Sequence, residues 1–145
     1  MFYKIKNKIQ NFLALKKTIK QSSYIRYNYL SEYIKKNKCK NILEIGTWNG
    51  LNSIRMLNAA CSQANDPHEI NYWGFDLWEL MSDDIFSKEY SKRPPKMAVV
   101  KKRLEKLGCN INLYQGDTIN TLKQFEESNS GKLNLDFIYI DGGHS

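Results

Sequence analysis

The fold of this chain is decided by residues 40–50, which read KNILEIGTWNG. Residues 41–45 are mostly apolar and predict a short buried strand. Gly46 and Gly50 punctuate the turn that follows, and a helix is expected to begin near Leu51. A strand, a tight turn and a helix are the opening unit of a doubly wound α/β domain.

The same turn excludes two common nucleotide-binding motifs. The dinucleotide fingerprint needs G-x-G-x-x-G, but Trp48 stands where its middle glycine would be, and no G-x-x-x-x-G-K-S/T loop is present. Gly46 allows a sharp turn, and Gly50 is expected to let the backbone lie close to a ligand. Free N–H groups at the start of the helix favour an anion, and one carboxylate fits beside Trp48 better than a pyrophosphate. Glu44, near the strand's end, can accept a hydrogen bond from an ammonium or hydroxyl group.

Three segments in order resemble a known family. Glu44-x-Gly46-x-x-x-Gly50 resembles motif I of the class I S-adenosylmethionine (SAM) dependent methyltransferases. The wording LEIGTWNG, with the later GFDLW and YIDGGHS, is similar to the branch of small-molecule and sugar O-methyltransferases related to macrocin O-methyltransferase and cephalosporin-hydroxylase-type proteins. The resemblance covers residues 42–145 and implies methyl transfer from SAM to a small hydroxylated molecule or sugar. The cofactor-binding residues expected on this basis are Glu44, Gly46, Thr47, Trp48, Asn49, Gly50, Asp76, Leu77, Trp78 and Asp117.

The rest of the chain predicts the other units of such a sheet. Residues 1–38 are expected to form an N-terminal helical segment and residues 39–145 a SAM-binding domain. Further strands are expected at 70–76, 111–115 and 135–140, and helices at about 24–37, 51–63, 96–107 and 118–127. The expected fold is therefore α/β, with a partial Rossmann-like doubly wound parallel sheet, strand order 3-2-1-4 and helices on both faces. Residues 77–95 form a long connection, which is expected to overhang the carboxyl end of the sheet as a lid.

Two acids follow the second and third predicted strands. In a doubly wound sheet an acid at the end of the second strand accepts the ribose hydroxyls, so Asp76 is the candidate, with a turn or cap role as the alternative. Trp78 is expected either to stack on the adenine or to wall the substrate site. By the resemblance, Asp117 is expected to meet the adenine amino group; it can also cap the helix that follows.

The last predicted strand leads into Asp141 and His144. Asp141 is expected at the cleft between strands one and four, either near the methyl acceptor or as a ligand of a divalent metal such as Mg²⁺. Such a metal would lower the pKa of the acceptor hydroxyl. His144 is the candidate general base, with a loop residue as the alternative. Asp141 alone is a weak metal site, because a hard cation takes several oxygen ligands.

Members of the resembled family continue with further strands, so this chain is expected to be truncated after strand four. Strand four would then be an exposed apolar edge. The alternative to an active methyltransferase is a SAM-binding fragment without turnover, which needs a partner chain or the missing half. A nicotinamide oxidoreductase is disfavoured by the absent fingerprint. The sequence leaves two kinds of protein partner open: a second copy of this chain in a homo-oligomer, or a different chain that complements it.

Composition supports a folded domain. Hydrophobic residues make up 41% of 145 residues, and no apolar run is long enough to span a membrane.

The formal net charge is +7, but the lysines are dispersed along the chain, so a solvated basic surface is favoured over nucleic-acid binding. The cysteines at 39, 61 and 109 are scattered and lack metal spacing, which predicts reduced thiols in a cytoplasmic protein. Residues 1–20 have a helical apolar stripe with lysines between, which favours packing on the domain or a partner over a membrane surface.

Overall fold

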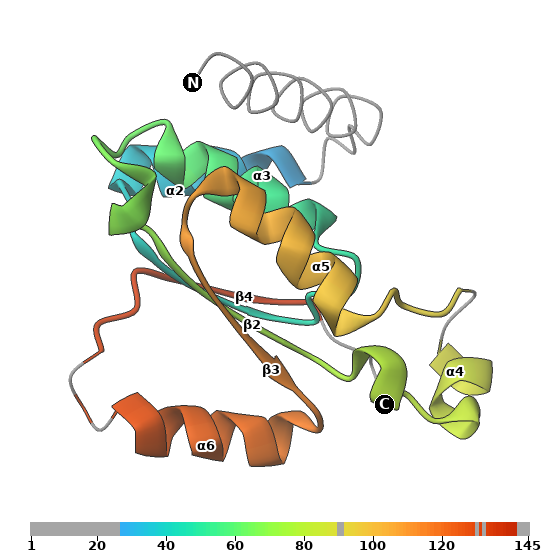
Figure 1. The fold of residues 1–145 in the computed structure, drawn as a ribbon. Coiled ribbons are helices and arrows are strands. Elements are labelled where there is room, and N and C mark those ends of the chain that lie inside the picture. Colours follow the sequence, from blue (N-terminus) through green and yellow to red (C-terminus); the bar gives the residue numbers. More distant parts are fainter. Residues whose placement is uncertain (1–26, 90–91, 130, 132, 142–145) are drawn as a thin grey trace, which may run out of the picture.

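The computed structural model describes residues 27–89, 92–129, 131 and 133–141, so the predicted N-terminal helix and His144 lie outside the described residues. At its centre is a parallel sheet of β1 (Asn41–Ile45), β2 (Asn71–Asp76), β3 (Asn110–Gln115) and β4 (Phe137–Ile140). The strands lie in the order β3-β2-β1-β4, as predicted (Figure 1). No helix in the described part of the chain is long and apolar enough to cross a membrane.

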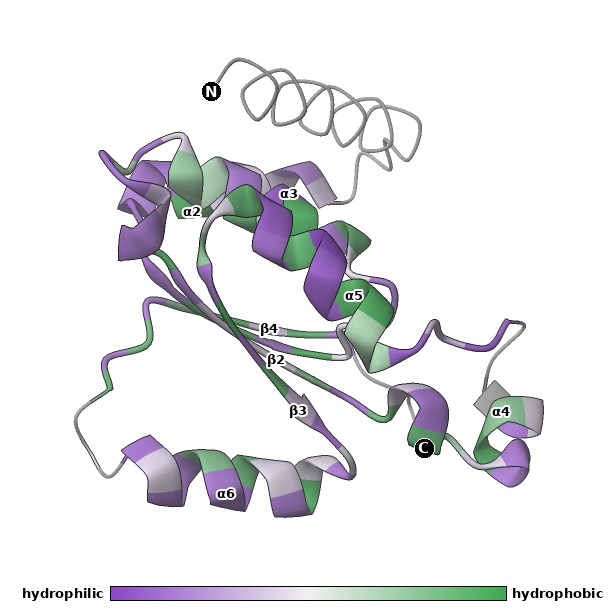
Figure 2. Ribbon diagram, viewed as in Figure 1, coloured by the Kyte–Doolittle hydropathy of each residue, from purple (hydrophilic) through white to green (hydrophobic). Residues whose placement is uncertain are grey.

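Helices cover both faces of the sheet. The helices α2 (Asn28–Asn37), α3 (Leu51–Cys61) and α5 (Met97–Leu104) lie on one face, and α6 (Thr118–Asn129) lies on the other (Figure 1). Figure 2 shows that these helices mix hydrophobic and hydrophilic residues, as expected of helices with one buried side. The predicted helix at 96–107 is α5 followed by one 3₁₀ turn, η4 (Glu105–Leu107), and it ends at Gly108 with φ 82°.

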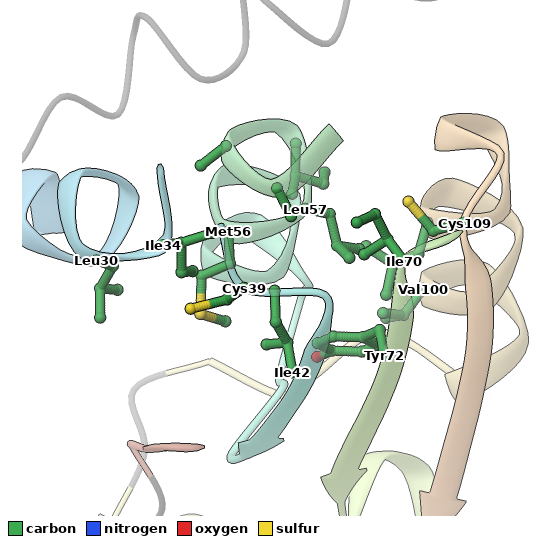
Figure 3. Packing of buried hydrophobic residues seen from close by; sticks show 14 of the residues in the cluster. Leu30, Ile34, Cys39, Ile42, Met56, Leu57, Ile70, Tyr72, Val100 and Cys109 are labelled. Atoms are coloured by element: carbon green, nitrogen blue, oxygen red, sulfur yellow. The ribbon is translucent and has the colours of Figure 1, made fainter. Parts of the chain in front are cut away.

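The larger core lies between the sheet and the first group of helices. Alternation along β1 and β2 turns Ile42 and Tyr72 toward these helices, where both are buried. Figure 3 shows side chains of the strands meeting those of α3. The members of this core include Leu30, Ile34, Ile42, Ile54, Leu57, Tyr72, Val100 and Leu104.

A smaller, aromatic core lies under α6. Phe125 of α6 meets Trp73, Phe75 and Tyr114 edge-on, with ring centroids 5.7–5.8 Å apart. Phe75 and Tyr114, which are register partners on β2 and β3, stack at 4.8 Å. Edge-to-face and offset stacking are the favoured arrangements of aromatic rings, so this group fixes α6 against β2 and β3.

The sheet ends at β4, whose apolar side chains are uncovered on the α6 face. Ile138 and Ile140 pair in register with Leu43 and Ile45 of β1, yet they are 55% and 68% exposed. The strand begins at Phe137 rather than at residue 135 as predicted. The reason is Asp136, whose carboxylate accepts the backbone N–H groups of residues 40 and 41, each at 2.8 Å. The exposed apolar edge predicted for strand four is thus present within the described residues.

The long connection after β2 contains its own short helices. These are η3 (Trp78–Leu80) and α4 (Asp83–Glu89), and α4 lies beyond the carboxyl ends of the strands in Figure 1. Arg93 ties the segment together, because it forms an ion pair with Asp83 and its guanidinium lies 4.5 Å from the ring centroid of Phe86. Glu79 accepts the backbone N–H of Met97 at 2.8 Å and so joins η3 to the start of α5.

Candidate functional site

The turn between β1 and α3 is held in place by β2. The N–H groups of Gly46 and Thr47 both donate to the carbonyl of Phe75, at 2.9 and 3.2 Å. Gly46 has φ 89°, a conformation that favours glycine, and the sharp turn predicted there is confirmed. The N-cap of α3 is Gly50, and the side chain of Asn49 before it accepts the N–H of Leu51 at 3.0 Å.

Gly50 lies against α5. A Cβ at this position would lie 3.1 Å from Val100 and 3.4 Å from Leu104, both on α5. The prediction that Gly50 brings the backbone close to a ligand stays a prediction, but the structure shows a second reason for glycine in the space that a side chain would fill. That space is taken by α5, and φ at Gly50 is 76°, which independently favours glycine.

Asp76 joins the turn to the segment after β2. Its Oδ2 accepts the N–H of Trp48 at 2.7 Å, and its Oδ1 accepts the N–H of Trp78 at 3.0 Å. Both tryptophans have positive φ, 45° and 44°, which is uncommon for large side chains. The structure therefore gives Asp76 the turn role that was its alternative, and it places the carboxylate at the carboxyl end of β2 beside the glycine turn.

The two tryptophans differ in exposure. Trp48 is 40% exposed, whereas Trp78 is fully buried and its ring N–H donates to the carbonyl of Trp48 at 2.8 Å. A buried ring offers no face for stacking, so the predicted adenine or substrate contact of Trp78 is not what this structure shows. Trp78 belongs to the core, and its hydrogen bond to Trp48 supports the turn. Leu77, between Asp76 and Trp78, is half-buried.

A buried polar cluster lies under the turn. The hydroxyls of Ser53 and Tyr72 both donate to Oε2 of Glu44, and the Tyr72 hydroxyl lies 3.2 Å from that of Thr47. Gly74 makes room for this cluster, because a Cβ there would lie 2.6 Å from the Thr47 hydroxyl. The four polar side chains connect β1, β2, the turn and α3.

Burial controls the charge of this cluster. The pKa of the Glu44 carboxyl is raised to about 8, chiefly by removal from water and to a smaller extent by the nearby Asp141 and Asp76, although the hydrogen bonds from Ser53 and Tyr72 lower it. Burial also raises the pKa of Tyr72 well above its ordinary value. Glu44 was predicted to receive an ammonium or hydroxyl group. Its Oε2 receives hydroxyls from within the protein.

Arg103 of α5 braces the outer side of the turn. Its guanidinium donates to the carbonyl of Asn49 at 2.5 Å, across 54 residues of sequence. Sequence reasoning missed Arg103, Tyr72 and Ser53. For Tyr72 a signal existed, since alternation along adjacent parallel strands places Tyr72 and Gly74 on the same face as Glu44.

The other predicted acids lie at the same edge of the sheet. Asp117 follows β3, and its side chain accepts the N–H of Ile119 at 2.8 Å, which confirms the helix-cap role. Asp141 follows β4, where its N–H donates to the carbonyl of Ile45 at 2.8 Å and its carboxylate accepts the Tyr139 hydroxyl at 3.0 Å. Both acids are exposed.

The described residues do not assemble a metal site. Among them no three His, Cys, Asp or Glu side chains are grouped so that they could hold a metal ion. Asp141 has the Tyr139 hydroxyl as its near neighbour, and a phenol hydrogen bond does not make a divalent site. Asp141 therefore has no further metal ligands grouped with it in the described part of the chain, where it was predicted as a Mg²⁺ ligand.

The chain matches a family model over most of its length. The model, described as a methyltransferase domain, matches residues 43–145. Comparison with curated proteins gives no match. The matched residues include the glycine turn and the ends of all four strands.

Solved structures share the fold. The chain is similar to the SAH-bound methyltransferase PaMTH1 of Podospora anserina, with a TM-score of 0.54 and 17% identity over 93% of this chain and 49% of that one. It is also similar to an O-methyltransferase of Bacillus cereus in complex with SAH, with a TM-score of 0.56 and 18% identity over 92% of this chain and 54% of that one. The chain thus spans about half the length of these solved structures, and at such identities the likeness is one of fold.

Proposed function

Since this chain belongs to the methyltransferase domain family, we propose that it binds SAM at the carboxyl ends of β1, β2 and β3 and acts in O-methyl transfer to a small hydroxylated molecule or sugar. The YIDGGHS segment supports placing it in the branch of macrocin O-methyltransferase and cephalosporin-hydroxylase-type proteins. The described residues would supply the cofactor-binding part of such an enzyme.

The observation that carries the proposal is the position of the Asp76 carboxylate. Two backbone N–H groups hold it at the edge of the glycine turn. No Lys or Arg in the described part of the chain forms an ion pair with it. Each oxygen has accepted one hydrogen bond and has capacity for another, so the carboxylate can accept both hydroxyls of a ribose.

The neighbouring groups fit the other parts of SAM. The first turn of α3 has no acidic residue, so its N-terminus suits the methionine carboxylate. Asp117 is exposed and keeps one oxygen, Oδ2, for the adenine amino group. Trp48, whose backbone N–H is bonded to Asp76, is 40% exposed, and its ring offers a flat apolar surface.

When bound, SAM supplies a sulfonium methyl group that an acceptor oxygen can attack in line. The protein has to hold the acceptor close to that methyl and to remove the hydroxyl proton. We propose that His144, which follows Asp141 by three positions in the sequence, is the base that takes this proton. No step through a metal ion is proposed, because the described residues do not supply its ligands.

The second candidate is SAM binding without turnover. It is favoured by the uncovered Ile138 and Ile140 of β4, the strand that borders the proposed acceptor side. In that case the chain needs a complementing chain, or more of its own sequence, for activity.

Isothermal titration calorimetry with SAM tests SAM binding, which both candidate functions require. We expect binding of SAM but not of NAD⁺, and Asp76→Ala should weaken SAM binding roughly 10- to 100-fold, as for loss of a charged hydrogen bond. Asp66→Ala is the matched control, because Asp66 also accepts a backbone N–H, that of His68, but precedes β2 at the other end of the strand. Equal affinities of wild type and Asp76→Ala would contradict the assignment. Methyl transfer to a panel of hydroxylated acceptors then separates turnover from binding alone.

A further inference from the structure

Two cysteines far apart in sequence meet at the end of the sheet opposite the proposed cofactor site. Cys61 is the last residue of α3, and Cys109 directly precedes β3. Their sulfur atoms lie 3.2 Å apart although 48 positions separate them in sequence. Figure 3 shows Cys109 beside Ile70, at the edge of the core. The third cysteine, Cys39, is buried elsewhere, with its sulfur 3.8 Å from the carbonyl of Asp136.

We propose that Cys61 and Cys109 are a reversible disulfide site. A disulfide has sulfur atoms about 2.05 Å apart, so the pair has to close by only about 1 Å. Both cysteines lie at the ends of hydrogen-bonded elements: Cys61 at the end of α3 and Cys109 just before β3. The N–H of Asn110, next to Cys109, donates to the carbonyl of Ile70 at 2.9 Å, and Cys61 completes the last turn of α3. The sequence predicted reduced thiols. In this proposal the reduced thiols are one state of the pair and the disulfide is the other.

The two thiols have different roles in the exchange. Cys61 is partly exposed, whereas Cys109 is 8% exposed. A hydrogen bond from Cys109 lowers the pKa of Cys61, while that contact and burial raise the pKa of Cys109. Cys61 is thus the thiol that an oxidant reaches and the better nucleophile at neutral pH.

Oxidised glutathione is a suitable oxidant by chemical class, a small disulfide. The Cys61 thiolate attacks one of its sulfur atoms, and one glutathione leaves as a thiolate that takes a proton from solvent. Cys109 then loses its proton to solvent and attacks the Cys61 sulfur of the mixed disulfide, and the second glutathione leaves. Two protein thiols are oxidised to one disulfide, and one glutathione disulfide is reduced to two thiols.

The disulfide would change the stability of the fold rather than the geometry of the proposed SAM site. It would tie the end of α3 to the start of β3 and close a loop that contains β2 and α5. Such a cross-link restricts the unfolded chain and raises stability, more so for longer loops. The glycine turn and Asp76 lie at the carboxyl ends of the strands, away from this pair, so the inference is independent of the proposed function.

The test is a redox titration of the folded protein with oxidised and reduced glutathione, followed by alkylation of free thiols and peptide mass spectrometry without reduction. We expect one intramolecular peptide pair joining residues 61 and 109, a free Cys39, and full reversal by reductant. The melting temperature of the oxidised form should exceed that of the reduced form by roughly 5–15 °C.

Cys39→Ser is the matched control, because it removes a buried cysteine but leaves the pair, and it should keep the oxidised-minus-reduced difference in melting temperature. Cys61→Ser and Cys109→Ser should each lose it. The mass spectrum of the wild type decides even where a variant folds poorly. Alkylation of both thiols in excess oxidised glutathione, a stable glutathione adduct on Cys61, or a link to Cys39 or to a second chain would each overturn the proposal.

Discussion

Replacement of Glu44 by Gln should change how the stability of this protein depends on pH. The Glu44 carboxyl is fully buried and its contacts in the structure are the hydroxyls of Ser53 and Tyr72. Gln has nearly the same shape and retains an oxygen that can accept these hydroxyls, but it does not titrate. The variant therefore removes a proton-binding group while leaving the packing in place.

The size of the effect follows from the difference between the folded and unfolded chain. Burial raises the pKa of Glu44 from an ordinary value of 4.5 to about 8. Between these values the folded protein keeps a proton that the unfolded chain has lost, so the free energy of unfolding falls as pH rises. The contribution is fully present below the lower value and lost above the upper one. At about 1.4 kcal/mol per pH unit, the loss amounts to roughly 5 kcal/mol.

The assay is urea unfolding of wild type and Glu44→Gln, followed by circular dichroism, in steps from about pH 5 to about pH 8. All other titrating groups are common to both proteins, so the difference between the two curves isolates Glu44. Tyr72 keeps its proton over this range, because burial raises its pKa above 10. We expect wild type to lose several kcal/mol relative to the variant between the two ends.

Parallel curves would refute the reasoning. They would mean that the Glu44 carboxyl titrates alike in the folded and unfolded chain, and hence that it is not held in a water-free cluster. A wild type that gains stability relative to the variant with rising pH would reverse the sign and show that the charged form is the one the fold stabilises.

Three further substitutions test the geometry around the turn. Gly74→Ala should destabilise the fold by roughly 1–3 kcal/mol in urea unfolding, because its Cβ would lie 2.6 Å from the Thr47 hydroxyl; an unchanged midpoint would contradict this packing. Asp76→Asn should cost roughly 1–3 kcal/mol of thermal stability, since the backbone N–H groups of two tryptophans lose a charged acceptor, and unchanged melting would argue against this role. Arg103→Met keeps an apolar stem but loses the hydrogen bond to Asn49, so amide exchange of the turn should accelerate several-fold with exchange of the sheet unchanged; uniform exchange would contradict a local brace.

Most of the fold could be predicted because its elements are coded locally. The run at 41–45 is mostly apolar, ends at a glycine turn and leads to a helix, and the structure has β1 at Asn41–Ile45 and α3 from Leu51. The start of β4 was predicted two residues early. Leu135 is apolar, but the side chain of Asp136 bonds the start of β1 and sets the boundary, which is a long-range effect that periodicity does not contain.

The site was harder to predict than the fold. The residues at strand ends could be found, because the topology of a doubly wound sheet brings them to one edge. The roles of Gly50 and Trp78 could not, since they depend on how α5 and the segment after β2 pack against the turn. The approach of Cys61 and Cys109 depends on the same tertiary packing, across 48 residues.

The strand order also has a consequence for the growing chain on the ribosome. β1 lies between β2 and β4, and Asp136, which bonds the N–H of Asn41, is made 95 residues later. At a synthesis rate of about 5–20 residues per second, one side of β1 waits roughly 5–20 s for its neighbour. During that interval one edge of β1, the edge that later pairs with β4, has no neighbouring strand. The nascent polypeptide is therefore expected to be a chaperone client until β4 emerges, and slower translation between β3 and β4 should increase chaperone occupancy in ribosome profiling of chaperone-bound chains.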